Sequence, residues 1–250
     1  MATSGTTTFN PSIDDIIEEA YERTNVRGAR TGYQLKSARR SLNILLSEWG
    51  NRGIHLWKIK LASVPLVEGQ ALYNWTSDTT NFPTDISDVL EAYVRNNTTA
   101  TAPVDTALSK IDRSTYSALP NKLSKGTPSQ YYVQRQAYVR NAAGTITASP
   151  NIYLYTTPSS SFSGANYKVN FYYMAQLEDV GAYTNTSDVI FRFYPALISG
   201  LAYYLSIKYS PERVADLKMI YEDELARAVA EDGQRTSTYI TPQTFYGDGV

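Results

Sequence analysis

The N-terminal part of the chain places apolar side chains at the spacing of α-helices. A first helix is predicted from Ser12, a suitable N-cap, with Asp14 and Asp15 in its first turn, up to a break at residues 25–28. Its apolar positions are Ile13, Ile16, Ile17, Ala20 and Tyr21. A second helix is predicted over residues 33–49, with Gly50 as its stop. Its apolar stripe consists of Leu35, Ala38, Leu42, Leu45, Leu46 and Trp49. Together they predict an antiparallel helical pair.

After Gly53 the apolar positions recur at every second residue, which indicates strands. The alternating runs are residues 57–61, 71–73, 89–94, 107–111, 130–133, 152–155 and 167–171. Prolines and glycines separate them, a helical turn is expected at 112–119, and polar loops are expected at 96–105 and 159–166. Short strands in this order predict an antiparallel β-sandwich or barrel.

Helical spacing returns near Pro195. Residues 196–209 are apolar almost all round, which predicts a buried helix, and Ser210 with Pro211 predicts the start of a further helix that ends near Glu231. The apolar face of that last helix consists of Val214, Leu217, Tyr221, Leu225 and Ala228. The two C-terminal helices form a second pair.

The order of helix pair, β-region and helix pair predicts an α+β fold. We expect a four-helix bundle built from the N- and C-terminal pairs, with the β-sandwich or barrel inserted and an extended C-terminal tail, because each pair has an apolar stripe to bury. The expected parts are a disordered N-terminus (1–10), a helical bundle domain (11–54 and 190–232), an inserted β-domain (55–189) and an extended docking tail (233–250).

The composition limits which catalytic and metal sites the chain can form. The chain has no cysteine, which removes thiolate metal sites and a cysteine nucleophile, and its one histidine, His55, is expected to be a structural or surface residue because the sequence nominates no catalytic partner for it. The adjacent carboxylates at 14–15, 18–19 and 222–224 are expected to form solvated helix faces, and Asp85 with Asp88 to belong to a turn. We therefore expect no catalytic residues, no metal and no cofactor. Tyrosine, present 21 times, suits half-exposed subunit interfaces.

The pattern of apolar positions predicts neither a signal peptide nor a membrane-spanning helix. The first eight residues have neither the basic nor the apolar region of a signal peptide, and the most apolar run, residues 193–207, is too short to span a membrane. We expect a protein made in a cytoplasm that does not contact a membrane.

Charge is unevenly distributed along the chain. Residues 23–60 hold nine cations and a single carboxylate, Glu48, whereas residues 178–232 hold ten carboxylates and five cations. Three interpretations stay open: the helix pairs neutralise each other, neighbouring subunits present complementary surfaces, or a basic band faces DNA phosphates. The candidate residues for channel or inter-subunit charge are Arg27, Arg30, Arg39 and Arg40.

The last eighteen residues carry large apolar side chains at the spacing of an extended peptide. They are Tyr239, Ile240, Phe245 and Tyr246. The tail is either a disordered end or an extended segment that adds to the sheet edge of a partner.

Several motifs in order resemble those of the head-to-tail adaptor (connector) proteins of short-tailed bacteriophages, also called tail tubular protein A or tail accessory factors. The motifs are Ala38–Asn43 with Leu45–Trp49 and Gly53; Arg113, Tyr116, Pro120, Lys122, Gly126–Pro128 and Tyr131–Val133; Ile152–Tyr155, Pro158 and 167–173; and Leu201–Leu205, Lys208, Tyr209, Arg213, Leu217, Lys218 and Tyr221. The resemblance covers roughly residues 11–232.

The resemblance implies a structural virion protein at the head–tail interface. It implies a ring, commonly of twelve copies, that docks beneath the portal protein through the C-terminal segment, supports a distal tail (nozzle or tail-tube) protein and conducts double-stranded DNA without reading its sequence. Two alternatives remain: a carbohydrate-binding or cell-wall-degrading virion module, and another virion part such as a stopper or tail-tube protein.

Overall fold

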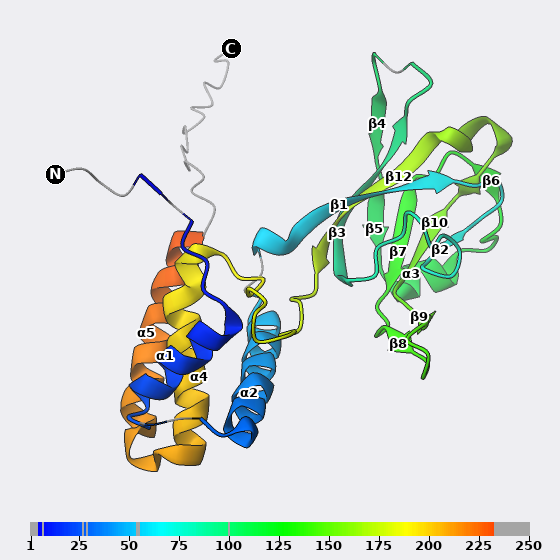
Figure 1. Ribbon diagram of the computed structural model, residues 1–250. Helices are drawn as coiled ribbons and strands as arrows, with labels where there is room; N and C mark the ends of the chain where they lie inside the picture. Colours follow the sequence, from blue (N-terminus) through cyan, green and yellow to red (C-terminus); the bar gives the residue numbers. More distant parts are fainter. Residues whose placement is uncertain are drawn as a thin grey trace, which may run out of the picture. The chain divides into compact units, whose positions relative to one another are not determined.

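The computed structural model describes residues 5–6, 8–26, 28, 30–53, 56–99 and 101–232. The chain forms two compact units, coloured along the sequence in Figure 1. We call Met1–Leu45 with Val180–Val250 the helical unit and Leu46–Asp179 the β unit. The helical unit contains α1 (Ile13–Arg23), most of α2 (Gly32–Asn51), η3 (Phe191–Phe193), α4 (Tyr194–Tyr209), η4 (Pro211–Arg213) and α5 (Val214–Asp232). The domain boundaries expected from the sequence stay predictions.

Helix α1 begins at the expected cap. The backbone N–H of Asp15 donates to the Ser12 hydroxyl at 3.2 Å, and the Ser12 N–H donates to the Asp15 carboxylate at 2.9 Å. This reciprocal pair satisfies two amides that the first turn would otherwise leave unpaired. The apolar face expected for this helix is buried throughout, so its prediction is confirmed.

Helix α2 extends past the expected stop. Gly50 lies within the last turn of the helix, whereas Gly53 has a positive φ of 74° and its N–H donates to the Gly50 carbonyl at 3.2 Å. Helices commonly end at a glycine in the left-handed conformation, and in α2 that residue is Gly53. Gly50 as the stop was therefore wrong by three residues. Of the predicted stripe, only Leu35 is half-buried and the rest is buried.

Helix α4 packs closely against its neighbours within the helical unit. A Cβ added to Gly200 would lie 2.8 Å from Cε2 of Tyr221 on α5 and 2.9 Å from Cδ2 of Leu45 on α2. Nine of its residues are buried, although Ile207 is exposed. The buried helix is thus confirmed in its main part.

The start of α5 differs from the expectation. Ser210 makes no capping hydrogen bond to the following helix; its hydroxyl donates to the Thr24 carbonyl at 2.8 Å instead. Arg213 donates to the neighbouring Arg23 carbonyl at 2.6 Å. The carbonyls that α1 leaves free at its end thus hold the α4–α5 turn, while the 3-10 turn η4 leads into α5.

The β unit contains two four-stranded sheets and two short strand pairs. The sheets have the orders β1-β12-β3-β4 and β2-β10-β7-β5, and the pairs are β11-β6 and β8-β9. The strands are β1 (Ile59–Leu66), β2 (Leu72–Tyr73), β3 (Ile86–Asn96), β4 (Val104–Ala107), β5 (Ser109–Ile111), β6 (Lys125–Gly126), β7 (Gln130–Gln134), β8 (Val139–Arg140), β9 (Ile146–Ala148), β10 (Asn151–Tyr155), β11 (Thr157–Pro158) and β12 (Gly164–Ala175). The other elements are η1 (Leu56–Lys58), α3 (Arg113–Ala118) and η2 (Ser160–Phe162).

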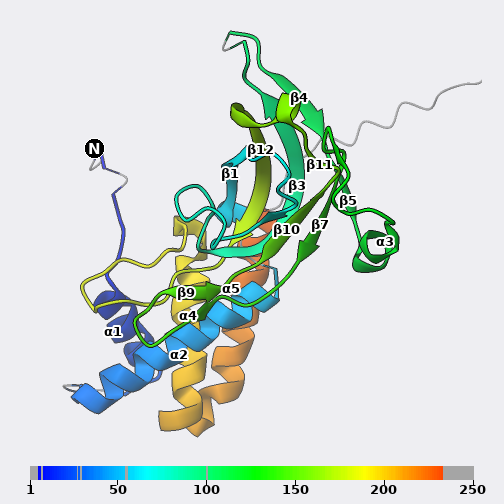
Figure 2. The same cartoon turned by 90° about the vertical axis from the view of Figure 1, so that its right-hand side faces the viewer.

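Two features of these sheets correct the expectation. No sheet among the described residues closes into a barrel, and two pairings, β5 with β7 and β6 with β11, are parallel. Parallel neighbours need a crossover connection, which α3 provides between β5 and β7, where it lies beside these strands (Figure 2). The helical turn predicted at 112–119 is confirmed as α3, with Asp112 as its N-cap.

One hydrophobic core draws on both four-stranded sheets. Val64, Phe171 and Val89 from the first sheet and Ile152 and Tyr131 from the second belong to a single cluster of buried side chains. The strands of the first sheet are held in register along nearly their whole length, for example Ile59 opposite Met174 and Val64 opposite Val169. The fold is therefore mixed α+β, while the four-helix bundle and the sandwich stay predictions.

Candidate interaction surfaces

Several of the carboxylates considered as candidate sites form ion pairs. Glu19 and Glu224 both contact Arg23, at 3.0 and 3.8 Å, and Asp85 contacts Lys60 at 2.8 Å. Asp88 pairs with Arg135. Within the part of the chain that the structure describes, no group of three or more histidine, aspartate or glutamate side chains could hold a metal ion. His55 lies outside the described residues.

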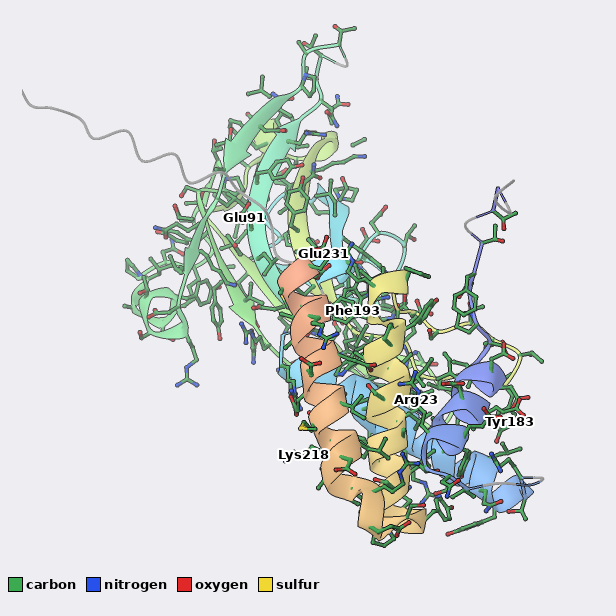
Figure 3. The ribbon with its side chains drawn as sticks, turned by 90° about the vertical axis from the view of Figure 1, so that its left-hand side faces the viewer. Arg23, Glu91, Tyr183, Phe193, Lys218 and Glu231 are labelled. Carbon is green, nitrogen blue, oxygen red and sulfur yellow. The ribbon has the colours of Figure 1, made fainter. Side chains whose placement is uncertain are left out.

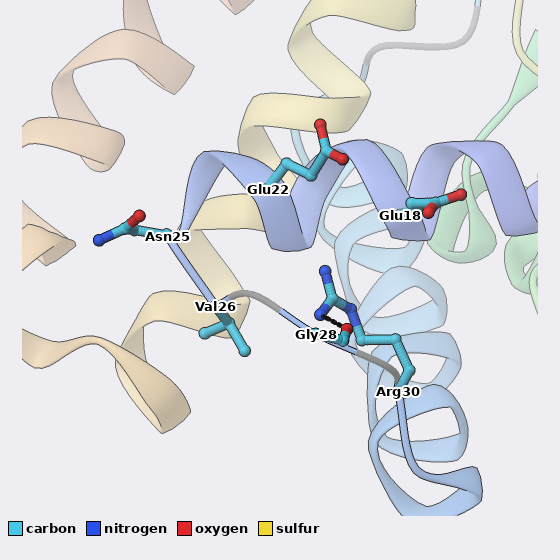
Figure 4. A pocket seen from close by; sticks show the side chains of 6 residues that line it. All are labelled: Glu18, Glu22, Asn25, Val26, Gly28 and Arg30. Atoms are coloured by element: carbon cyan, nitrogen blue, oxygen red, sulfur yellow. Dashed lines mark hydrogen bonds between the residues drawn. The ribbon is translucent and has the colours of Figure 1, made fainter.

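Arg30, one of the four candidate arginines, belongs to the turn between α1 and α2. Its Nη1 donates to the Gly28 carbonyl at 2.6 Å, and its Cζ lies 4.7 Å from the centre of the Tyr21 ring. The same arginine lines an open cavity of about 420 Å³ beside Glu18 and Glu22 (Figure 4). This side chain is therefore engaged in the turn. Arg27 lies outside the described residues.

The other two candidate arginines lie on α2 in different settings. The guanidinium of Arg39 lies 5.4 Å from the centre of the Tyr183 ring, a cation–π contact within the helical unit. Arg40 is exposed and has no ion-pair or hydrogen-bond partner among the described residues. The structure thus does not gather Arg30, Arg39 and Arg40 into one band, and their roles stay predictions.

Charge neutralisation between the helix pairs is partial. Arg23 of α1 contacts Glu224 of α5, but Lys208 of α4 donates to the hydroxyls of Ser37 and Ser41 on α2, at 3.1 and 2.6 Å. Lys208 thus faces hydroxyls of α2, whereas Lys36 and Arg40 of α2 face solvent. This leaves the complementary-surface interpretation open. The tail residues Tyr239, Ile240, Phe245 and Tyr246 lie outside the described residues.

Three tyrosines form a cluster on the outer face of the second sheet that the sequence reasoning did not single out. The ring centres of Tyr116 on α3, Tyr132 on β7 and Tyr153 on β10 lie 5.3–5.8 Å apart. Burial raises the pKa of Tyr116. Since the rings cover one another's faces, the cluster fixes α3 on the sheet. The alternation around Tyr132 and Tyr153 was the signal that could have revealed it.

The β3–β4 hairpin projects from the first sheet (Figure 1). Arg95 and Asp105, opposite each other on the two strands, form a bidentate pair with N–O distances of 2.7 and 2.6 Å. Hydrogen bonding to Arg95 lowers the pKa of Asp105. Val104 beside this pair is 60% exposed, so the hairpin carries an apolar side chain into solvent.

Charged helices, a projecting hairpin and outward tyrosines define a protein that acts through its surfaces. A family model described as SU10 adaptor protein matches residues 5–244, and the chain therefore belongs to the SU10 adaptor protein family. A search of curated proteins found no match.

Membership of this family makes the chain a phage adaptor protein, a structural component of the virion at the head–tail connector. The expectation of a structural phage adaptor is thereby confirmed, and the narrower assignment to the tail tubular protein A group stays a prediction. No helix among the described residues is long and apolar enough to cross a membrane.

Proposed function

We propose that the chain is the ring-forming adaptor that docks beneath the portal, extends the DNA channel and supports the next tail component. The match to the adaptor family over residues 5–244 carries this proposal. In detail, we propose a ring of about twelve copies. Each copy contains a four-helix bundle and an inserted β-sandwich over about 55–189, and the DNA passes through the ring without sequence-specific contacts.

The composition supports a conduit for DNA. Each phosphate that a protein neutralises releases counterions and strengthens binding, so a channel wall that conducts DNA needs few net cations. A ring repeats each charge in every copy, and the formal net charge of this chain is −1. A ring of such subunits does not surround the DNA with a large positive excess.

The tail is assigned to portal docking. Deletion of residues 233–250 is expected to leave both compact units folded and to weaken binding to the portal protein of the same phage by at least about tenfold, because the apolar side chains at 239, 240, 245 and 246 supply the contact. Co-sedimentation with purified portal rings measures the loss.

A matched control removes residues 1–10 from the other end, and circular dichroism reports folding of both variants. Unchanged portal binding after the C-terminal deletion would remove the docking role from the tail. Failure of the full chain to bind portal rings would contradict the proposed function itself.

A further inference from the structure

The outer stripe of α2, opposite its buried face, is basic at its centre and apolar at both ends. Lys36 and Arg40 are exposed there and have no hydrogen-bond or ion-pair partner among the described residues. Tyr33 and Ile44 flank them and are 75% and 50% exposed. Side chains at spacings of three and four residues share one helix face, so these four form one stripe, which we call the basic stripe.

The outer stripe of α5 has the reverse arrangement. Met219 and Ile220 lie at its centre and are 69% and 41% exposed. Asp216 and Asp223 lie one turn to either side, and both are exposed. Asp223 pairs with the exposed Arg227, whereas Asp216 has no partner among the described residues. We call Asp216, Met219, Ile220 and Asp223 the acidic stripe.

The two stripes lie on opposite sides of the helical unit. Figure 1 shows α5 and α2 flanking α4, and in Figure 3, viewed from the side of α5, α2 lies behind α4. Both stripes point away from the buried faces of their helices, which are formed by Leu217, Tyr221 and Leu225 on α5 and by Ala38 and Leu42 on α2. One copy of the chain therefore cannot bring its own two stripes together.

We infer that the basic stripe binds the acidic stripe of a second copy of this chain, in a head-to-tail contact. The pairing places the apolar stems of Lys36 and Arg40 over Met219 and their charged ends near Asp216 and Asp223. Tyr33 and Ile44 cover the ends of the contact. A contact between two different faces repeats from copy to copy and closes into a ring when the rotation allows it.

A second copy fits the basic stripe better than DNA does. Phosphate recognition is carried mainly by cations, and this stripe has two of them next to the exposed apolar side chain of Ile44, to which phosphates do not bind. The chain itself exposes the matching carboxylates on α5. The inference rests on the proposed function, in which the adaptor acts as a ring of copies. Beyond that function, it identifies the residues that join one copy to the next.

Reversal of charge on one stripe at a time tests the contact. The variant Lys36→Glu/Arg40→Glu and the variant Asp216→Lys/Asp223→Lys are each expected to weaken self-association by at least about tenfold, because each then presents two stripes of the same sign. An equimolar mixture of the two, and a chain that carries all four substitutions, are expected to regain association, since opposite signs meet again. Sedimentation velocity of the full chain across a concentration series measures this.

The control is Lys218→Glu, an exposed cation of α5 that lies off the stripe and next to buried Leu217 (Figure 3). It is expected to associate like the original chain. Circular dichroism confirms that each variant is folded, and the recovered association of the mixture excludes simple misfolding as the cause of the losses.

Three results would overturn the inference: the original chain stays monomeric up to its solubility limit, the single-stripe variants associate normally, or the mixture of folded variants stays monomeric. The original chain could instead bind a double-stranded DNA fragment. If the variant Lys36→Glu/Arg40→Glu lost that binding but kept normal self-association, the basic stripe would be assigned to DNA. Because portal binding is measured separately, disproof of the contact between the basic and acidic stripes would not disprove the proposed function.

Discussion

Three buried or half-buried tyrosines of the β unit form hydrogen bonds to the backbone through their hydroxyls. Tyr131 donates to the Leu90 carbonyl at 3.1 Å, and Tyr138 donates to the Pro83 carbonyl at 3.0 Å. The hydroxyl of Tyr73 accepts from the Val67 N–H at 3.1 Å. Desolvation raises the pKa of Tyr73, Tyr131 and Tyr138 to about 12 in each case.

These tyrosines predict an alkaline limit of stability. Below about pH 10 they are neutral in both states and their contribution is intact. Above it the unfolded chain loses the protons first, so the free energy of unfolding is expected to fall as the pH rises from about 10 to 12. Urea unfolding at a series of pH values measures the free energy of unfolding, and tyrosinate absorbance of the native protein measures the ionisation of its tyrosines.

A single absorbance step near pH 10 for all 21 tyrosines of the native protein would contradict the prediction. Tyr131→Phe, which cannot ionise, is expected to reduce the loss between pH 10 and 12.

Among the elements, α4 depends on a glycine that its neighbours do not allow to be replaced. Gly200→Ala is expected to destabilise the protein by about 1–3 kcal/mol, because its Cβ meets buried Tyr221 and Leu45 and this outweighs the gain in helix propensity. Gly50→Ala provides the matched control: it lies in exposed helix with nothing near its Cβ, so a gain of up to about 1 kcal/mol is expected. Urea unfolding measures the change in the free energy of unfolding for each variant. Equal changes for Gly200→Ala and Gly50→Ala would contradict the packing argument.

The helices were predictable because their signals are local. Ser12 and Asp15 determine the start of α1 within four residues, and the apolar spacing of α2 is continuous. The errors arose where a distant group competes with the local signal. Ser210 has the residue type of a cap, but its hydroxyl finds the Thr24 carbonyl, which is 186 positions away in the chain. Of two nearby glycines, only the backbone angle identifies Gly53 as the stop.

At the scale of the whole molecule, two compact units, of which the β unit has its own buried cluster, predict separable folding. The fragment Leu46–Asp179 is expected to fold by itself, because both sheets and their shared core lie within it. Near-ultraviolet circular dichroism and a cooperative thermal transition test this. A fragment that lacks fixed aromatic signals would show that the β unit depends on the helical segments.

Sheet pairing and surface function were the least predictable features. Alternation located most of the strands, but it could not say that β1 pairs with β12, whose partner residues are 98 to 115 positions apart. Nor could it separate Arg30, folded onto Tyr21, from Arg40, which is exposed. Charge and residue type narrow the candidates along the chain, but only the fold decides which side chains share a face.

The pairing of β1 with β12 also bears on how such a protein changes over generations. The strand that begins the first sheet and the strand that completes it run antiparallel, with Ile59 opposite Met174. The segment between them returns to this sheet as β3 and β4, and β3 lies along the other side of β12. Surface loops of this segment can therefore change in length over generations while β1 and β12 keep their register, whereas exchange of the whole segment would remove β3 from beside β12.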